Sequence, residues 1–266
     1  TRLDALLVER TLAESRTQAQ SLIREGLVAV DGRLEDKPGT LVRADAIVIV
    51  RPTRRFVGRG AVKLQGALDS FGVSPSGVAC LDVGASTGGF TDLLLVRDAR
   101  IVYAVDVGRG QLAWRLRGDP RVVNLERTDI RSVESLPEPI DLVTVDVSFI
   151  SLRLVLPCLP PLLSPAGRVL ALVKPQFEVI RDAEVHREVL VDLSRHLDAR
   201  RWLVVGAVGS PITGTSGNRE FWLHLTRSAP TRQTMTPEEV GALARATEGI
   251  PSEPRPDSPE RPSPRR

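Results

Sequence analysis

Residues 80–90 read Cys-Leu-Asp-Val-Gly-Ala-Ser-Thr-Gly-Gly-Phe, and this stretch decides the fold. Leu81 and Val83 are typical of the end of a buried strand, whereas residues 84–89 are too rich in glycine to extend it. Apolar residues return at helical spacing from Phe90. A strand, a glycine turn and a helix N-terminus bring backbone N–H groups together, so a small polar ligand can approach closely. The spacing is neither G-x-G-x-x-G nor that of a P-loop, which argues against those two phosphate-binding motifs.

Composition sets wide limits on the class of protein. The chain has 266 residues, 42% of them hydrophobic, enough for one large domain with a proper core and a small second domain. A net charge of +3 permits binding to nucleic acid without requiring it. Cys80 and Cys158 have apolar neighbours, as buried thiols of a cytosolic protein do. The sequence shows no signal peptide and no apolar run of about 18 residues, so we expect a cytoplasmic protein that does not span a membrane.

The first 51 residues form a small unit of their own. Leu3, Leu6 and Leu7 fall at helical spacing, and a second amphipathic helix follows them. Residues 28–33 then predict a strand that runs into an Asp-Gly turn, and residues 46–50 predict another strand. We therefore expect an α+β domain over residues 1–51.

A basic segment follows this unit. Residues 51–63 contain four arginines and one lysine but no acid. Such a run is either a solvated linker or the continuation of a surface that follows nucleic-acid phosphates. We assign residues 52–59 to an interdomain linker.

Strands and helices alternate over residues 60–229. The predicted strands are 78–83, 101–106, 122–125, 142–147, 169–173, 203–208 and 220–225, and the main helices are 62–71, 90–97, 152–163 and 183–200. This alternation predicts a largely parallel sheet with helices on both faces. The short connection between the last two strands can join only an antiparallel pair. The fold class is therefore α/β, a seven-stranded Rossmann-like sheet with one reversed strand and a small α+β domain before it.

Residues 230–266 have a different composition. They are rich in proline and poor in apolar side chains, so burial cannot offset the entropy of ordering them. The sequence predicts a disordered tail, with a short helix at residues 237–244.

The glycine-rich stretch resembles the first motif of S-adenosylmethionine (AdoMet) methyltransferases, and a seven-stranded sheet with one reversed strand is their pattern. Ligands of such sheets bind at the carboxyl ends of the strands. Asp106, at the end of the second strand, could accept the ribose hydroxyls of a nucleoside. Asp129 could accept from an adenine amino group while Ile130 packs on the ring. The residues expected to contact the donor are Asp82, Gly84, Ala85, Ser86, Thr87, Gly88, Gly89, Phe90, Asp106, Asp129, Ile130 and Asp146.

Four charged residues are expected to converge beside this pocket. Lys174 directly follows a buried apolar strand, where poor hydration would favour the neutral amine. Asp146 ends the neighbouring strand, Glu220 opens the last strand, and Lys63 lies early in the first helix of the sheet domain. A neutral lysine could take the proton of a weakly acidic hydroxyl as a methyl group arrives.

The motifs together resemble the TlyA family, which pairs an S-four RNA-binding domain with an FtsJ-type methyltransferase domain. The resemblance rests on Arg59-Gly-Ala-Val-Lys63-Leu, residues 82–90, Asp146-x-Ser-Phe-Ile-Ser-Leu152, Leu172-Val-Lys174-Pro-Gln-Phe-Glu178 and Ser216-Gly-Asn-x-Glu220, and on Ser15-Arg16-x-x-Ala19 and Lys37-Pro38 in the first unit. It implies methylation of cytidine ribose 2′-hydroxyls in ribosomal RNA of the ribosomal subunits, with AdoMet as cofactor. It also implies that the catalytic Lys-Asp-Lys-Glu set is Lys63, Asp146, Lys174 and Glu220.

The same resemblance implies an RNA-binding surface. Arg2, Arg16 and Lys37 would face RNA phosphates, and Arg54, Arg55 and Arg59 would extend this surface along the linker. Each of them could instead be a solvated surface charge. We expect no metal and no membrane partner, and a monomer.

One departure from the family pattern lies after Glu178, where about ten residues of a glycine-rich loop are missing. Two alternatives therefore stay open. One is an RNA-binding, AdoMet-sensing protein that has lost catalysis, and the other is a membrane-lytic haemolysin, for which the sequence offers no amphipathic membrane element.

Overall fold

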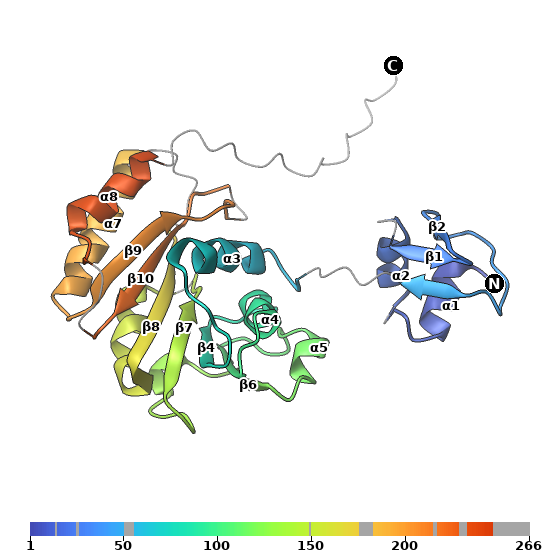
Figure 1. The fold of residues 1–266 in the computed structure, drawn as a ribbon, viewed down its shortest axis with the longest axis horizontal. Helices are drawn as coiled ribbons and strands as arrows, with labels where there is room; N and C mark the ends of the chain where they lie inside the picture. Colours follow the sequence, from blue (N-terminus) through green and yellow to red (C-terminus); the bar gives the residue numbers. More distant parts are fainter. Residues whose placement is uncertain are drawn as a thin grey trace, which may run out of the picture. The chain divides into compact units, whose positions relative to one another are not determined.

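The computed structural model of the protein describes residues 1–13, 15–24, 27–50, 56–148, 150–175, 183–214, 217–228 and 233–246. The chain divides into two compact units, Thr1–Arg55 and Phe56–Arg266 (Figure 1). Residues 56–59, predicted as the end of the linker, therefore belong to the second unit. The backbone N–H of Val57 donates to Asp92 Oδ2 at 2.9 Å, which attaches this segment to the larger unit.

The first unit is a small α+β domain. Its elements are α1 (Leu3–Glu9), α2 (Arg16–Arg24), β1 (Val28–Val30), β2 (Arg33–Glu35) and β3 (Val48–Val50). The three strands form an antiparallel sheet in the order β2-β1-β3. Leu3, Leu7 and Ile23 are fully buried, because residues at helical spacing share one face of each helix. The predicted pair of amphipathic helices is confirmed.

The second unit holds all the remaining elements. In chain order they are α3 (Gly60–Phe71), β4 (Ala79–Val83), α4 (Gly89–Val96), β5 (Ile101–Asp106), α5 (Trp114–Arg117), β6 (Val122–Glu126), a 3-10 turn (Ile130–Ser132), β7 (Ile140–Val145), α6 (Leu152–Val155), two 3-10 turns (Leu156–Cys158 and Pro160–Leu162), β8 (Leu163–Val173), α7 (Ala183–Asp198), β9 (Leu203–Gly209), β10 (Phe221–Thr226) and α8 (Pro237–Ala246).

Seven strands form one sheet in the order β6-β5-β4-β7-β8-β10-β9. The pairs from β6 to β8 are parallel, whereas β10 runs antiparallel to both β8 and β9. The predicted reversed strand is confirmed. The strand order changes direction beside β4, so the carboxyl ends of β4, β5 and β7 frame a crevice.

Helices cover both faces of this sheet (Figure 1). Cys80 and Val102 point toward α3 and α4 and share a core with Leu64. Their neighbours along the strands, Leu81 and Tyr103, point to the opposite face, where α6, α7 and α8 pack. Side chains of a strand alternate between the two faces of a sheet, and both faces are buried here. No described helix is both long and apolar enough to cross a membrane.

Two sequence predictions need correction. The helix expected over residues 152–163 is α6 followed by two 3-10 turns, because Pro157, Pro160 and Pro161 have no backbone N–H for an α-helix. The predicted tail over residues 230–266 is not disordered over residues 233–246, and the short helix expected at residues 237–244 is confirmed as α8. Val240 and Ala244 of this helix are buried in the core beside α7. The rest of the tail lies outside the described residues.

Candidate active site

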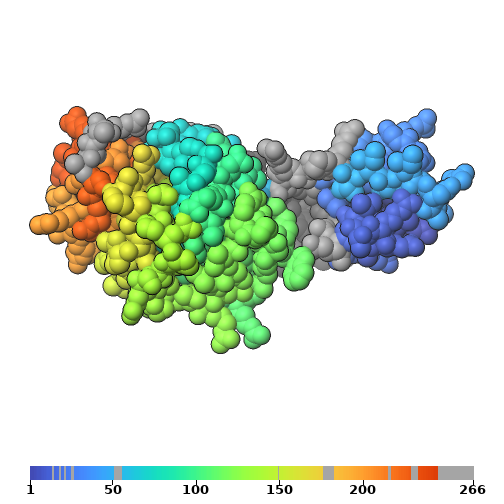
Figure 2. Space-filling view, turned by 60° about the horizontal axis from the view of Figure 1, so that its bottom comes forward, coloured from blue at the N-terminus to red at the C-terminus, as the bar shows by residue number. Residues whose placement is uncertain are grey.

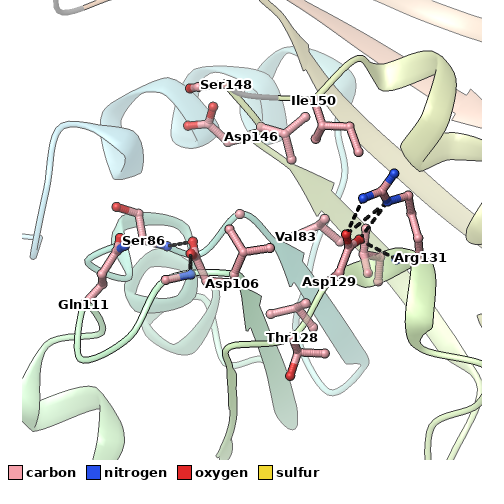
Figure 3. A pocket seen from close by; sticks show the side chains of 16 residues that line it. Val83, Ser86, Asp106, Gln111, Thr128, Asp129, Arg131, Asp146, Ser148 and Ile150 are labelled. Carbon is pink, nitrogen blue, oxygen red and sulfur yellow. Dashed lines mark hydrogen bonds and ion pairs between the residues drawn. The ribbon is translucent and has the colours of Figure 1, made fainter.

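A pocket of about 440 Å³ lies at the carboxyl ends of β4, β5 and β7. Gly84 and Ser86 from the glycine turn, Asp106 from β5 and Asp146 after β7 all line it (Figure 3). Apolar side chains including Val107, Ile130, Val147 and Ile150 complete the wall. The pocket therefore combines carboxylates with apolar surface suited to a flat ring.

Gly84 brings two main chains together at the centre of the site. Its φ of +85° lies in the left-handed region, which favours glycine. A Cβ atom at this position would overlap the carbonyl oxygen of Asp146. Any other residue at position 84 would therefore push β4 and β7 apart where the pocket begins.

Asp106 is held in place by the turn that it faces. Its Oδ2 accepts from the backbone N–H of Ser86 at 2.8 Å, and its Oδ1 accepts from the N–H of Gly108 at 2.7 Å (Figure 3). A carboxylate offers about four acceptor positions, so each oxygen can still accept from a ligand hydroxyl. The predicted position of Asp106 on the pocket wall agrees with the structure.

Asp129 lines the pocket in a different state from the one expected. Its carboxylate forms an ion pair with Arg131 at 2.6 Å and caps the following turn through the N–H of Arg131 at 2.9 Å (Figure 3). The hydrogen bonds from Arg131 hold the pKa of Asp129 below its usual value. Asp129 could accept from an adenine amino group only with an oxygen that it shares with Arg131.

Six of the predicted donor contacts do not line the pocket. Asp82 is fully buried beneath the turn. Its Oδ2 accepts from the N–H and the hydroxyl of Thr91 at 2.9 and 2.7 Å, and its Oδ1 accepts from Thr144 Oγ1 at 3.2 Å. Its role is therefore to join α4 to β7 rather than to touch a ligand. The other five residues outside the lining are Ala85, Thr87, Gly88, Gly89 and Phe90.

The last three of these pack the turn against its neighbours. Gly88 lies against Leu116, Gly89 lies against Gly60, and the ring of Phe90 packs on Trp222 with centroids 5.4 Å apart. The motif thus supports the turn as much as it forms the pocket.

Burial raises the pKa of Asp82 from 3.8 to about 7. Between these two values the folded protein keeps a proton that the unfolded chain releases, so the free energy of unfolding falls as the pH rises. In Asp82→Asn the amide remains neutral and can donate to Thr144. We expect the unfolding free energy of the variant, measured in urea, to rise by about 3 kcal/mol relative to that of wild type between about pH 5 and about pH 8. The exposed Asp198→Asn is the control, and parallel pH profiles for wild type and Asp82→Asn would contradict the expectation.

The four predicted catalytic residues form two ion pairs. Lys63 Nζ lies 2.6 Å from Glu220 Oε2, with side chains only 11% and 5% exposed. Lys174 forms an ion pair with Asp146 and donates to Ser148 Oγ at 2.8 Å. Asp146 and Ser148 both line the pocket (Figure 3). A carboxylate and a hydroxyl group therefore hold the amine of Lys174 at the edge of the pocket.

The two pairs also influence each other. Burial raises the pKa of Glu220, the charges of Lys63 and Lys174 oppose this rise, and the charge of Asp146 adds to it. Gly214 leaves room for the carboxylate, because a Cβ there would stand 2.6 Å from Glu220 Oε1. Lys63, Asp146, Lys174 and Glu220 are therefore one electrostatic cluster at the edge of the pocket.

The sequence prediction missed several lining residues, among them Gln111, Thr128, Arg131 and Ser148. The amide of Gln111 lies against Gly108, beside Asp106 (Figure 3). The Gly108-x-Gly-Gln111 spacing after a strand-end acid was a usable signal. No pattern in the sequence indicated the ion pair between Asp129 and Arg131.

The predicted RNA-binding residues of the first unit surround a buried acid. Asp4 is fully buried and accepts from Arg2 at 3.0 Å, from Arg16 at 3.1 Å and from Gln20 at 2.9 Å. These hydrogen bonds, led by that of Arg2, hold the pKa of Asp4 well below its usual range. The side chains of both arginines remain about half exposed. Lys37 is exposed.

The other predicted RNA-binding residues lie in the basic segment that follows the first unit. Arg59 donates to the carbonyl oxygen of Thr213 at 3.0 Å and is exposed. Arg54 and Arg55 lie outside the described residues, as does the departure from the family pattern after Glu178. In the described part of the chain, no group of three His, Cys, Asp or Glu side chains is placed to hold a metal ion.

Comparisons with known proteins agree with this division. A family model described as FtsJ-like methyltransferase matches residues 56–227, and one described as S4 domain matches residues 1–48. The 16S/23S rRNA (cytidine-2'-O)-methyltransferase TlyA of Mycobacterium tuberculosis is 46% identical over 238 residues, covering 84% of this chain and 89% of that protein. Hemolysin A of Brachyspira hyodysenteriae is 37% identical over 238 residues, with 84% and 98% covered. A solved structure from Streptococcus thermophilus superposes with a TM-score of 0.67 at 37% identity, covering 92% of this chain and 94% of the other.

Proposed function

The chain belongs to the TlyA family, in which an S-four domain precedes an FtsJ-like methyltransferase domain, and on this premise we propose that it methylates the ribose 2′-hydroxyl of cytidines in ribosomal RNA, with AdoMet as the methyl donor. The observation that carries the proposal is the position of Asp146. This residue lines the pocket and also forms an ion pair with Lys174. Because the same carboxylate lines the pocket and contacts Lys174, the Lys174 amine lies close to where the donor would present its methyl group.

The residues of the pocket fit AdoMet. Asp106 would accept from the ribose hydroxyls, since its two oxygens face the pocket and keep free acceptor positions. Ile130 and Ile150 would pack on the adenine ring, and the close approach at Gly84 leaves main chain at the wall. When bound, AdoMet supplies an electrophilic methyl group on a sulfonium.

The Asp106 assignment has a direct test. We expect Asp106→Ala to weaken AdoMet binding about 100-fold, because hydrogen bonds to a charged group contribute about 1.5–3 kcal/mol. Isothermal titration of wild type and variant with AdoMet measures this loss, and Asp198→Ala is the control in an exposed position. Affinity within about threefold of wild type would exclude Asp106 from ribose binding.

Lys174 is the group that takes the proton of the ribose hydroxyl. Asp146 orients its Nζ by the ion pair, and Ser148 fixes the amine through a hydrogen bond of 2.8 Å. The Lys174 side chain is 23% exposed, so the ammonium can release a proton to solvent before the RNA binds. Loss of that proton leaves a lone pair on Nζ, which would accept the hydroxyl proton while the ribose oxygen bonds to the methyl carbon, the bond from that carbon to sulfur breaks and the donor leaves as a neutral thioether.

Lys63 and Glu220 adjust the charge around this amine. The charges of Lys63 and Lys174 both act on Glu220, so the two ion pairs form one cluster around the amine. Glu220 keeps Lys63 in position through a contact of 2.6 Å. Alignment of the ribose oxygen with the methyl group contributes much of the remaining rate.

The proposed function is tested by methyl transfer. Purified protein is incubated with AdoMet labelled in the methyl group and with small or large ribosomal subunits from cells that lack the protein. We expect label in RNA, resistant to alkaline cleavage at one or more cytidines, as a 2′-O-methyl group is. Absence of label from both subunits, while AdoMet still binds, would favour the alternative of an RNA-binding protein without catalysis.

A further inference from the structure

Trp114 is the most exposed large apolar side chain of the second unit among the described residues, at 79%. Val107 follows at 69% and begins the connection between β5 and α5, whereas Trp114 is the first residue of α5. The chain has two other tryptophans, Trp202 and Trp222, which are 1% and 0% exposed. An exposed tryptophan ring offers a flat face on which a nucleic-acid base can stack.

The ring stands on a rigid base. Its neighbours Leu112 and Leu116 are 3% and 2% exposed, and both pack against Gly88 of the glycine turn. The N–H of Ala113 donates to the carbonyl oxygen of Thr87 at 3.1 Å. These contacts attach α5 to the turn and hold the backbone of Trp114 in place. Binding of a partner to the ring should therefore cost little backbone conformational entropy.

Arginines are concentrated in the segment that carries the ring. Residues 107–118 contain three arginines and no acid. Arg115 and Arg117 form ion pairs with Asp92 and Glu126, which fix the guanidinium groups while their side chains stay 53% and 31% exposed. Arg109 is exposed as well. This combination of an aromatic face with fixed arginines suits a nucleic acid strand better than an apolar protein surface.

The connection also forms part of the pocket wall. Val107, Gly108 and Gln111 line the pocket, and Trp114 follows three residues later (Figure 3). The segment that carries α5, green in Figure 2, lies at the surface of the second unit. An RNA strand that places a ribose at the pocket would therefore have neighbouring nucleotides within reach of this surface.

We propose that Trp114 is a stacking platform for an unpaired base of the RNA substrate, next to the donor pocket. The inference rests on the proposed methylation of RNA and adds a contact that reads no base identity, because every base has a π-face. Stacking on an aromatic side chain would strengthen RNA binding by about 10- to 100-fold.

The test uses the full chain and two probes. The affinity for large and small ribosomal subunits is measured for wild type, Trp114→Ala, Trp114→Phe and the exposed control Leu154→Ala. A single-stranded oligocytidine RNA is then titrated into each protein while tryptophan fluorescence is recorded. Trp202 and Trp222 are buried, so the RNA cannot stack on them and should quench them little. We expect Trp114→Ala to lose about 10- to 100-fold in subunit affinity, Trp114→Phe to retain most of it, and AdoMet affinity to stay unchanged in all variants. The oligonucleotide should quench wild type but not Trp114→Phe.

Two results would overturn the inference. One is wild-type affinity of Trp114→Ala for both subunits. The other is weaker subunit binding without any quenching by RNA, which would indicate a contact with a ribosomal protein. A wild-type protein that is quenched by RNA but transfers no methyl group to either subunit would instead contradict the proposed function and leave the stacking role in place.

Discussion

Lys174→Arg is expected to reduce methyl transfer about 1,000-fold while AdoMet still binds, since general base catalysis contributes about 10²–10⁴-fold. Arginine keeps the positive charge beside Asp146 but does not give up its proton in proteins. The variant therefore preserves the ion pair and removes only the capacity to accept the ribose proton. Single-turnover transfer to ribosomal subunits measures the chemical step, and titration with AdoMet confirms that the pocket is intact.

The same exchange at another position is the control for this result. Lys37 is exposed in the first unit, where the expected partner is a phosphate, and Lys37→Arg keeps the charge that such a contact needs. We expect it to retain most of the transfer. Lys174→Met should be as inactive as Lys174→Arg. Transfer by Lys174→Arg within about tenfold of wild type would remove Lys174 from the role of base.

The composition of the chain supports the distinction between the two residues. The chain has three lysines against 33 arginines. Two of the three, Lys63 and Lys174, belong to the cluster beside the pocket. Arginine can supply a surface charge or a contact with a phosphate. It cannot gain and lose a proton at neutral pH. Lysine at position 174 is what the proposed chemistry requires.

The pair of Lys63 and Glu220 should have the largest effect on stability. Lys63→Met leaves Glu220 buried without its partner, and Glu220→Gln does the same to Lys63, so each is expected to cost about 3–5 kcal/mol of unfolding free energy. The double variant should recover much of this loss, because no unpaired charge stays buried. Urea unfolding of the four proteins gives the coupling energy of the pair as a double-mutant cycle.

The pH dependence adds a second check. The pKa of Glu220 is already raised by burial in the native cluster, and removal of Lys63 takes away the charge that opposes this rise. Lys63→Met should therefore become less stable relative to wild type as the pH increases, since the unfolded chain then releases a proton that folded Glu220 retains. The exposed pair of Arg97 and Asp69, at 2.8 Å, is the control and should contribute less than about 1 kcal/mol. Additive losses in the Lys63/Glu220 cycle would mean that the two residues do not act as a pair.

The order of the strands could be predicted because it depends on patterns of many residues. The alternation of apolar strands with helices determines a parallel sheet, and the short connection before Glu220 requires a reversed last strand. This order brings Asp146 and Lys174 to adjacent strand ends, so their contact followed from topology. The same reasoning placed Asp106 on the pocket wall.

Other features depend on local geometry that one sequence does not reveal. Whether Asp82 faces the pocket or the layer below it depends on where the strand ends, and the structure buries it against Thr91 and Thr144. The pairing of Asp129 with Arg131 depends on a turn two residues long. The packing of α8 on α7 could not be predicted, because it depends on a small number of apolar residues, such as Val240 and Ala244, within a proline-rich region.

The meeting of main chains at Gly84 limits how the enzyme can be re-engineered. The backbone of residue 84 meets the carbonyl oxygen of residue 146 at the cavity wall, and no side-chain replacement can create space there. A donor analogue that carries a bulkier alkyl chain would need space from an apolar side chain of the lining, such as Ile150. Libraries aimed at labelling RNA with larger groups should therefore vary position 150 and leave the glycine untouched.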